Sequence, residues 1–237
     1  MKNLFAFSIL LAAMAVLTTP AAAQWSLDAE GGFQLNNTRV TGVGALLNGI
    51  PKSILTPYGR ISTTYAASDK LGLRAGVGFS QKGFQLAQGL NVNVFNVPIG
   101  IGAKVATSAD YVEVPLEGLY SINKGNTTLL VTAGANVGYA VGARIRPKVS
   151  VIIDFNLPKI PIDLDDDIYN RWDVSGTAGF GMIQKTSKGN LILQGRYVQS
   201  LSNFLDNPIL GMKIKPYSFQ FSVGYQVPLG KRSGIRA

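Results

Sequence analysis

The sequence contains no cysteine and no histidine. Without cysteine the chain can form neither a disulfide bond nor a thiolate nucleophile. Without histidine it lacks the usual base of Ser-His and Cys-His nucleophile pairs and the common zinc ligands. A mechanism that uses only carboxylates stays open in principle, but no pair of acids at a strand end indicates one. We therefore expect no catalytic residues, no metal site and no cofactor.

Long hydrophobic runs are also scarce, since one run at residues 4–17 is the longest in the chain. Lys2 precedes it and the small residues Ala21, Ala22 and Ala23 follow it, which is the order of a secretion signal. As a helix its 14 residues would reach about 21 Å, less than the apolar layer of about 30 Å. We predict a signal peptide at residues 1–23 and one domain at residues 24–237. Gln24 stands where a lipoprotein would need cysteine.

Charged residues are few, 15% of the chain, and the net charge is +9. A basic chain can bind nucleic acid or anionic surfaces. Here the lysines and arginines are scattered, and an exported protein does not meet nucleic acid. We expect interior ion pairs, charged turns and contacts with anionic lipid headgroups, and no nucleic-acid partner.

Alternation of apolar and polar residues dominates the rest of the chain and predicts an all-β protein. Leu71 and Leu73, for example, share one strand face, while Gly72 and Arg74 share the other. Most of the segments are about 9–13 residues long, enough to cross a bilayer when tilted. The predicted strands cover residues 25–35, 57–65, 71–82, 111–120, 127–143, 172–185, 191–200 and 216–228.

The connections between these segments alternate in length. Residues 66–70, 121–126 and 186–190 form short turns, and residues 36–56, 83–109, 144–171 and 201–215 form long loops. Short turns at one end and long loops at the other are typical of outer-membrane barrels. We predict an eight-stranded antiparallel transmembrane β-barrel of up-and-down topology, in the outer membrane, with both termini in the periplasm.

A soluble β-barrel or sandwich such as a lipocalin is the alternative, because alternation does not say which face lies inside. Aromatic residues near the ends of the apolar faces favour the membrane barrel, since they would form interfacial girdles. They are Tyr65, Tyr120, Tyr139, Trp172, Tyr197, Tyr217 and Tyr225.

Two motifs resemble a known family. Residues 111–120 (YVEVPLEGLY) resemble the fourth-strand signature of PorT-like outer-membrane β-barrel proteins, and residues 78–83 (GFSQKG) resemble the end of the preceding strand. Gly118 and Phe79 depart from the commonest residues of these motifs. The resemblance implies a Bacteroidota-type outer-membrane barrel over nearly all of the mature chain. A few members are linked to a protein secretion apparatus and to gliding.

The polar faces, turned inward, place eight charged residues in the lumen. One interpretation is an ion path or a proton-handling carboxylate pair, although Glu113 and Glu117 lie about 13 Å apart along one strand. The interpretation we favour is a network of ion pairs that fills the barrel, because buried charges persist when they are paired. The residues are Asp28, Glu30, Arg60, Arg74, Glu113, Glu117, Asp173 and Arg196.

The long loops carry the remaining candidates. Asp163, Asp165, Asp166 and Asp167 could bind a hard cation such as Ca²⁺, or could balance the basic residues of the same loop. Residues 91–101 and 149–155 are unusually apolar and alternate like strands, which strand extensions above the membrane would explain. They either pack on each other as a lid or form a surface that binds a partner. The candidates for partner contact are Val94, Phe95, Ile152 and Phe155.

The sequence thus predicts a monomeric, non-enzymatic barrel in contact with outer-membrane lipid. It would have a structural or interaction role and could bind an envelope protein through its long loops. A small transport pore and a subunit of a protein secretion apparatus are the alternatives.

Overall fold

The computed structural model describes residues 24–41, 51–94, 97–150, 154–156, 160–162, 171–202, 205–207 and 212–229. The predicted signal peptide lies outside these residues. Eight long strands are β1 (Gln24–Thr41), β3 (Ile54–Ala66), β4 (Leu71–Val94), β5 (Val97–Lys124), β6 (Thr127–Ser150), β9 (Trp172–Lys185), β10 (Asn190–Ser200) and β12 (Met212–Pro228). Four short ones are β2 (Pro51–Lys52), β7 (Asp154–Asn156), β8 (Ile160–Ile162) and β11 (Leu205–Asn207). Within the described ranges, no helix is long and apolar enough to span a membrane.

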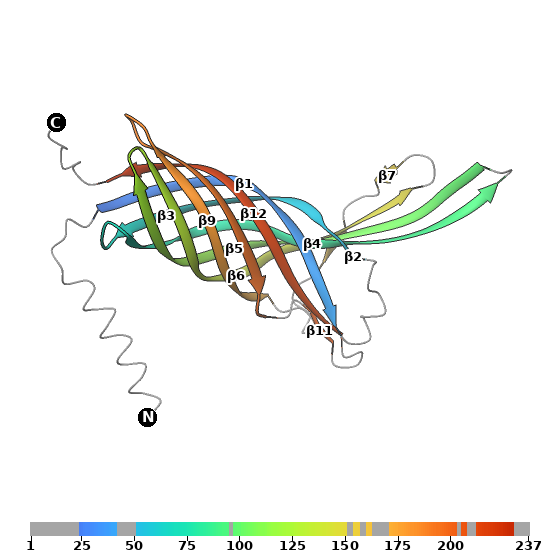
Figure 1. Ribbon diagram of the computed structural model, residues 1–237. Coiled ribbons are helices and arrows are strands. Elements are labelled where there is room, and N and C mark those ends of the chain that lie inside the picture. Colours follow the sequence, from blue (N-terminus) through green and yellow to red (C-terminus); the bar gives the residue numbers. More distant parts are fainter. Residues whose placement is uncertain are drawn as a thin grey trace, which may run out of the picture.

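The long strands form a closed barrel (Figure 1). Each pairs antiparallel with its neighbour in the order β1-β3-β4-β5-β6-β9-β10-β12, and β12 pairs with β1 from Ser26↔Pro228 to Thr41↔Lys213. Closure leaves no free sheet edge along the barrel wall. The predicted eight-stranded, up-and-down barrel is confirmed.

The two ends of the barrel differ. Residues 67–70, 125–126 and 186–189 connect strands tightly at one end, which we call the turn end. Gly125 takes the left-handed conformation (φ 58°) that a two-residue hairpin turn favours. β1 begins and β12 ends at this same end (Figure 1). The opposite end, where β1, β4, β6 and β10 finish, is the loop end.

Several strands extend beyond their predicted ends, and the prediction of a long loop at residues 83–109 is wrong. β4 and β5 pair at every residue from Gly83↔Ser108 to Val94↔Val97, so this segment is a hairpin. It projects well past the other strands at the loop end (Figure 1). β6 also continues, and its Val149 pairs with Phe155 of β7. The described parts of the two apolar segments, residues 91–94, 97–101, 149–150 and 154–155, lie in strands, so strand extension is confirmed for them, and a lid and a partner surface are both compatible with it.

The outward face of the barrel is apolar and the inward face is polar. In β3, Ile61 is 61% exposed on the outside while its neighbour Arg60 is 4% exposed inside. Phe180 of β9, at 74% exposure, is an extreme example of the outward pattern. A continuous apolar surface around a barrel is stable against lipid and not in water. This arrangement excludes the soluble barrel, in which the apolar face would line the interior.

Aromatic side chains gather at both ends of the apolar band. Near the turn end the rings of Trp25 and Tyr65 lie 4.9 Å apart. Near the loop end Tyr139 and Trp172 lie 5.0 Å apart, and further pairs join Tyr197 to its neighbours on β12. In β1 the exposed apolar side chains run from residue 25 to residue 35. That stretch spans about 33 Å along the strand, or about 25 Å across a bilayer at a tilt of about 40°.

Candidate functional site: the charged lumen

All eight predicted lumen charges point into the barrel, where each is at most 5% exposed. The structure divides them into two groups. The first, here called the central cluster, consists of Asp28, Glu30, Arg60, Arg74, Glu117 and Arg196. The second, here called the loop-end cluster, consists of Glu113, Asp173 and a residue that the prediction omitted, Lys82. Glu113 and Glu117 belong to different clusters, so they do not share a proton.

Glu30 on β1 is the best-paired carboxylate of the central cluster. Arg60 of β3 donates to its Oε1 through Nη2 at 2.8 Å and Nε at 3.0 Å. Arg196 of β10 donates to its Oε2 through Nη2 at 2.5 Å, and the Ser222 hydroxyl donates to the same oxygen at 2.8 Å. Glu30 therefore ties together side chains from four strands.

Glu117 on β5 holds the opposite side of the cluster. Arg60 donates to it through Nη1 at 2.9 Å, and Nε of Arg196 lies 3.5 Å from the same oxygen. Arg74 is paired more loosely, with Nε 3.2 Å from Asp28 and Nη1 3.6 and 3.7 Å from Glu30 and Glu117.

The central cluster blocks the middle of the lumen. Three carboxylates face three guanidinium groups, so its formal charge is zero, and each of the six side chains is at most 1% exposed. An eight-stranded barrel leaves an interior that side chains can just fill. The arrangement matches a space-filling ion-pair network and leaves no open ion path through this level.

The loop-end cluster is centred on Lys82 of β4. Its Nζ lies 2.7 Å from Oε1 of Glu113 and 2.5 Å from Oδ2 of Asp173, and the ring of Tyr111 lies 5.0 Å away. Ser202 donates a further hydrogen bond to Asp173 at 2.8 Å. With two carboxylates and one ammonium, this cluster carries one excess negative charge.

Sequence reasoning missed Lys82, although the signal was present. Lys82 lies an even number of residues after Arg74 in the same strand, β4, so the two side chains share the inward face. It was omitted because the predicted strand ended there. The two family-like motifs also meet at this point, since Lys82 pairs with Glu113. Gln81 of the first motif donates to Asp110, which directly precedes the second, at 2.6 Å.

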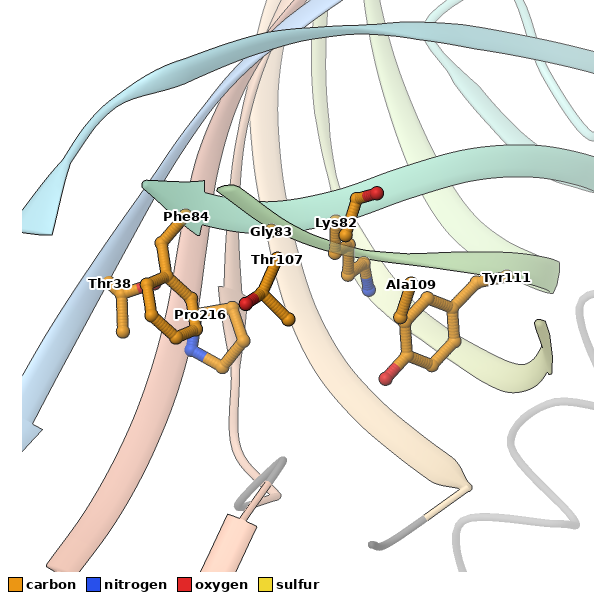
Figure 2. A pocket seen from close by; sticks show the side chains of 9 residues that line it. Thr38, Lys82, Gly83, Phe84, Thr107, Ala109, Tyr111 and Pro216 are labelled. Atoms are coloured by element: carbon orange, nitrogen blue, oxygen red, sulfur yellow. The ribbon is translucent and has the colours of Figure 1, made fainter. Parts of the chain in front are cut away.

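Close packing continues around Lys82 (Figure 2). Lys82 lines a gap of about 10 Å³, and Thr38 of β1, Phe84 of β4 and Pro216 of β12 gather at the other side of this gap. That is about the space that one water molecule needs. Side chains therefore fill the space around Lys82, while a separate cavity of about 310 Å³ opens at the loop end beside Gln81, Gln85 and Ser108.

The predicted loop candidates are only partly placed. Val94 ends β4 and its backbone pairs with Val97, and Phe155 lies in β7 opposite Val149. Phe95 and Ile152 lie outside the described residues, as do the four aspartates of residues 163–167. Among the residues that are described, no group of acids is arranged to hold a metal ion.

Glycines make room for the central cluster. A Cβ at Gly224 would lie 2.5 Å from the carbonyl oxygen of Ala29 and 2.6 Å from Cγ of Glu30. We expect Gly224→Ala to lower the free energy of unfolding by about 1–3 kcal/mol, because backbone and the buried carboxylate must both shift. Urea unfolding of the protein in lipid vesicles would measure this.

Gly31→Ala is the matched control, because a Cβ there meets no atom within 4 Å. It should leave stability within about 0.5 kcal/mol of the parent. If Gly224→Ala and Gly31→Ala lowered the free energy of unfolding equally, the lack of space for a Cβ would not be the reason that residue 224 is glycine.

Solved structures with some likeness to the chain are barrel proteins of outer membranes. Ail, the attachment invasion locus protein of Yersinia pestis, has 16% identity and a TM-score of 0.36 over 86% of this chain and 99% of its own. OprG of Pseudomonas aeruginosa has 12% identity and a TM-score of 0.39 over 86% and 97%. The outer membrane protease OmpT of Escherichia coli has 10% identity and a TM-score of 0.47 over 89% and 98%. No curated protein matches the sequence.

The family comparison is more informative. The model of the outer membrane protein beta-barrel domain matches residues 19–206, which is well over half of the chain. The match includes seven of the eight long strands and every residue of the two charge clusters. The chain therefore belongs to the outer membrane protein beta-barrel domain family, whose members reside in the outer membrane.

Proposed function

We propose that this outer-membrane barrel is a non-enzymatic anchor that presents an interaction surface, the β4–β5 hairpin, to a protein of the cell envelope. The observation that carries the proposal is the blocked lumen. Because the central cluster fills the barrel, the lumen is not suited to transport. The strand faces in the wall are committed to lipid and lumen, so contacts with a protein partner must be made at the barrel ends.

The β4–β5 hairpin is the most extended structure at the loop end (Figure 1). Residues 83–103 contain no charged residue, and both strands are paired to their tips. Beyond Leu86, β4 has β5 as its one partner strand among the described residues. Exposed edge strands usually carry charges that prevent pairing with other chains. An uncharged edge is instead suited to bind an extended segment of a partner through backbone hydrogen bonds.

Conductance tests the blocked lumen. We expect the reconstituted protein to show no stable channels in planar bilayers, because the central cluster leaves no continuous aqueous path. An established porin reconstituted in the same planar bilayers would serve as the positive control. Large and stable single-channel currents would overturn the anchor proposal in favour of a transport pore.

Shortening the hairpin tests the interaction surface. Residues 89–102 would be replaced by Asn-Gly, which joins Gln88 to Ala103 in their present register and suits a two-residue turn. The barrel should still fold, seen as a shift in gel mobility without heating. Proteins cross-linked to the full chain in native outer membranes should be lost from the variant.

A finer variant set separates the hairpin from the neighbouring loop. Val94→Ser with Phe95→Ser should abolish the cross-linked product if the hairpin makes the contact, and Ile152→Ser with Phe155→Ser should not. Loss of thermal stability without any loss of partner would instead support a lid. An unchanged cross-linking pattern in all these variants would contradict the proposed surface.

We further propose that the chain is a PorT-like member of its family with both termini in the periplasm. The support is the pair of motifs, whose Gln81, Lys82 and Glu113 make contacts with each other's strands in the lumen. A role as a subunit of a secretion apparatus follows only from this resemblance. Purification of the protein from native membranes, with secretion components among the captured proteins, would support that role.

A further inference from the structure

We propose that the turn end of the lumen is a binding site for a small aliphatic carboxylate. A cavity of about 560 Å³ opens there, between the turns and the central cluster. Cavities of about 300–1,000 Å³ are typical of small-molecule sites. The cavity lies at the opposite end of the barrel from the hairpin, so this site is independent of the function proposed above.

One wall of this cavity is apolar, which is unusual for this lumen. Leu119 of β5, Leu130 of β6 and Ile183 of β9 line it from three adjacent strands, and Ile192 packs behind Leu130 and Ile183. Elsewhere the inward positions are mostly Ser, Thr, Gln, Gly or charged residues. Apolar side chains contribute little in a water-filled mouth, but they gain by covering an aliphatic chain.

The opposite wall is polar and the inner end is cationic. Ser26, Thr64, Asn190 and Gln226 line the cavity from the β1, β3, β10 and β12 side, and Arg74 lines its inner end. A molecule with one apolar end and one polar end would match the apolar wall and the polar, cationic side of this cavity.

Arg74 is the group that would hold the carboxylate. Its Nε donates to Thr64 at 2.9 Å and its Nη1 to Gln194 at 3.1 Å, while Nη2 is buried without a hydrogen-bond partner. A buried unsatisfied donor is costly, so a small turn of Arg74 that brings Nη2 to an acceptor delivered by a ligand is favoured. Guanidinium groups match carboxylates in geometry and charge.

Arg74 is also the arginine of the central cluster that lacks a close ion pair. Its carboxylate neighbours lie 3.2–3.7 Å away, whereas Arg60 and Arg196 each have a carboxylate oxygen within 2.5–2.9 Å. An additional anion is therefore best accommodated at Arg74. Lys185 and Asp69 both line the cavity and offset each other in charge.

Calorimetric titration of the protein in lipid nanodiscs would test the site, with sodium octanoate as the probe and empty nanodiscs to correct for partition into lipid. We expect saturable binding of one octanoate per barrel. Octanol, which has the same chain without the charge, should bind at least about tenfold more weakly, since charge-assisted hydrogen bonds are the stronger ones. Octylamine should not bind.

Two aromatic substitutions on β6 locate the binding. Thr128→Phe would fill the cavity, because Thr128 lines it, and should weaken octanoate binding at least about tenfold. Leu129→Phe is the matched control, because Leu129 faces outward at 41% exposure. Gel mobility without heating would show that both variants are folded. The proposal is overturned if octanoate gives the signal of empty nanodiscs, if octanol binds equally well, or if Thr128→Phe binds like Leu129→Phe.

Discussion

Replacing Glu30 with glutamine is expected to lower the free energy of unfolding by about 3–5 kcal/mol, the usual cost of breaking a buried ion pair. Glutamine has nearly the same size as glutamate, so the change in the free energy of unfolding measures the loss of the negative charge. Glu30 accepts hydrogen bonds from Arg60 and Arg196 inside a cluster of zero formal charge. Without it, three guanidinium groups would face two carboxylates. Urea unfolding in lipid vesicles, followed by tryptophan fluorescence, would measure the loss.

Asp69→Asn is the matched control, since it removes one negative charge from an exposed turn and should change stability by no more than about 0.5 kcal/mol. The double substitution Glu30→Gln with Arg196→Gln restores the charge balance and should recover part of the loss. If Glu30→Gln were as mild as Asp69→Asn, the lumen would contain water and the cluster would not fill it.

The barrel itself could be predicted because a spanning strand must be amphipathic along its whole length. Residues 172–182 and 216–228 alternate without interruption, and the strands predicted at residues 172–185 and 216–228 end in the structure within a few residues of these bounds. The even number of such segments and their short turns then left few topologies. The eight predicted lumen charges could be identified from their positions along the strands, because side chains two residues apart share a face.

The strand ends at the loop end could not be predicted in the same way. Residues 83–109 contain small and amide residues that are as common in loops as in strands, and a hairpin outside the membrane needs no lipid-facing pattern. The predicted strand therefore ends at residue 82, and its last inward residue, Lys82, is missing from the predicted lumen charges. Tertiary pairing with β5 is what holds this segment as a strand.

The pairing within the lumen was also beyond sequence reasoning. Glu30 and Arg60 are directly opposite on neighbouring strands, and cross-strand pairs of this kind can be found once the register is known. Arg196 reaches Glu30 from β10 across the intervening β12, which only the closed barrel allows. Strand alternation identifies which charges face inward, and barrel closure decides which of them meet.

Replacing Lys82 with methionine is expected to have the second large effect on stability, a loss of about 3 kcal/mol or more. Methionine keeps most of the length of the side chain and removes its charge. Glu113 and Asp173 would then face each other in a buried site without the ammonium that now lies 2.5–2.7 Å from both. The loop end should loosen first, so proteolysis near β9 and β10 should become faster while the midpoint of urea unfolding falls.

Lys124→Met is the matched control, because Lys124 is exposed beside the turn at residues 125–126, and it should change neither measurement. Adding Asp173→Asn to Lys82→Met removes one of the two facing carboxylates and should recover part of the stability. A single substitution at Lys82 that behaves like the one at Lys124 would mean that the loop-end carboxylates are hydrated. In that case water would reach Lys82 and its two carboxylates, and only the central cluster would block the barrel.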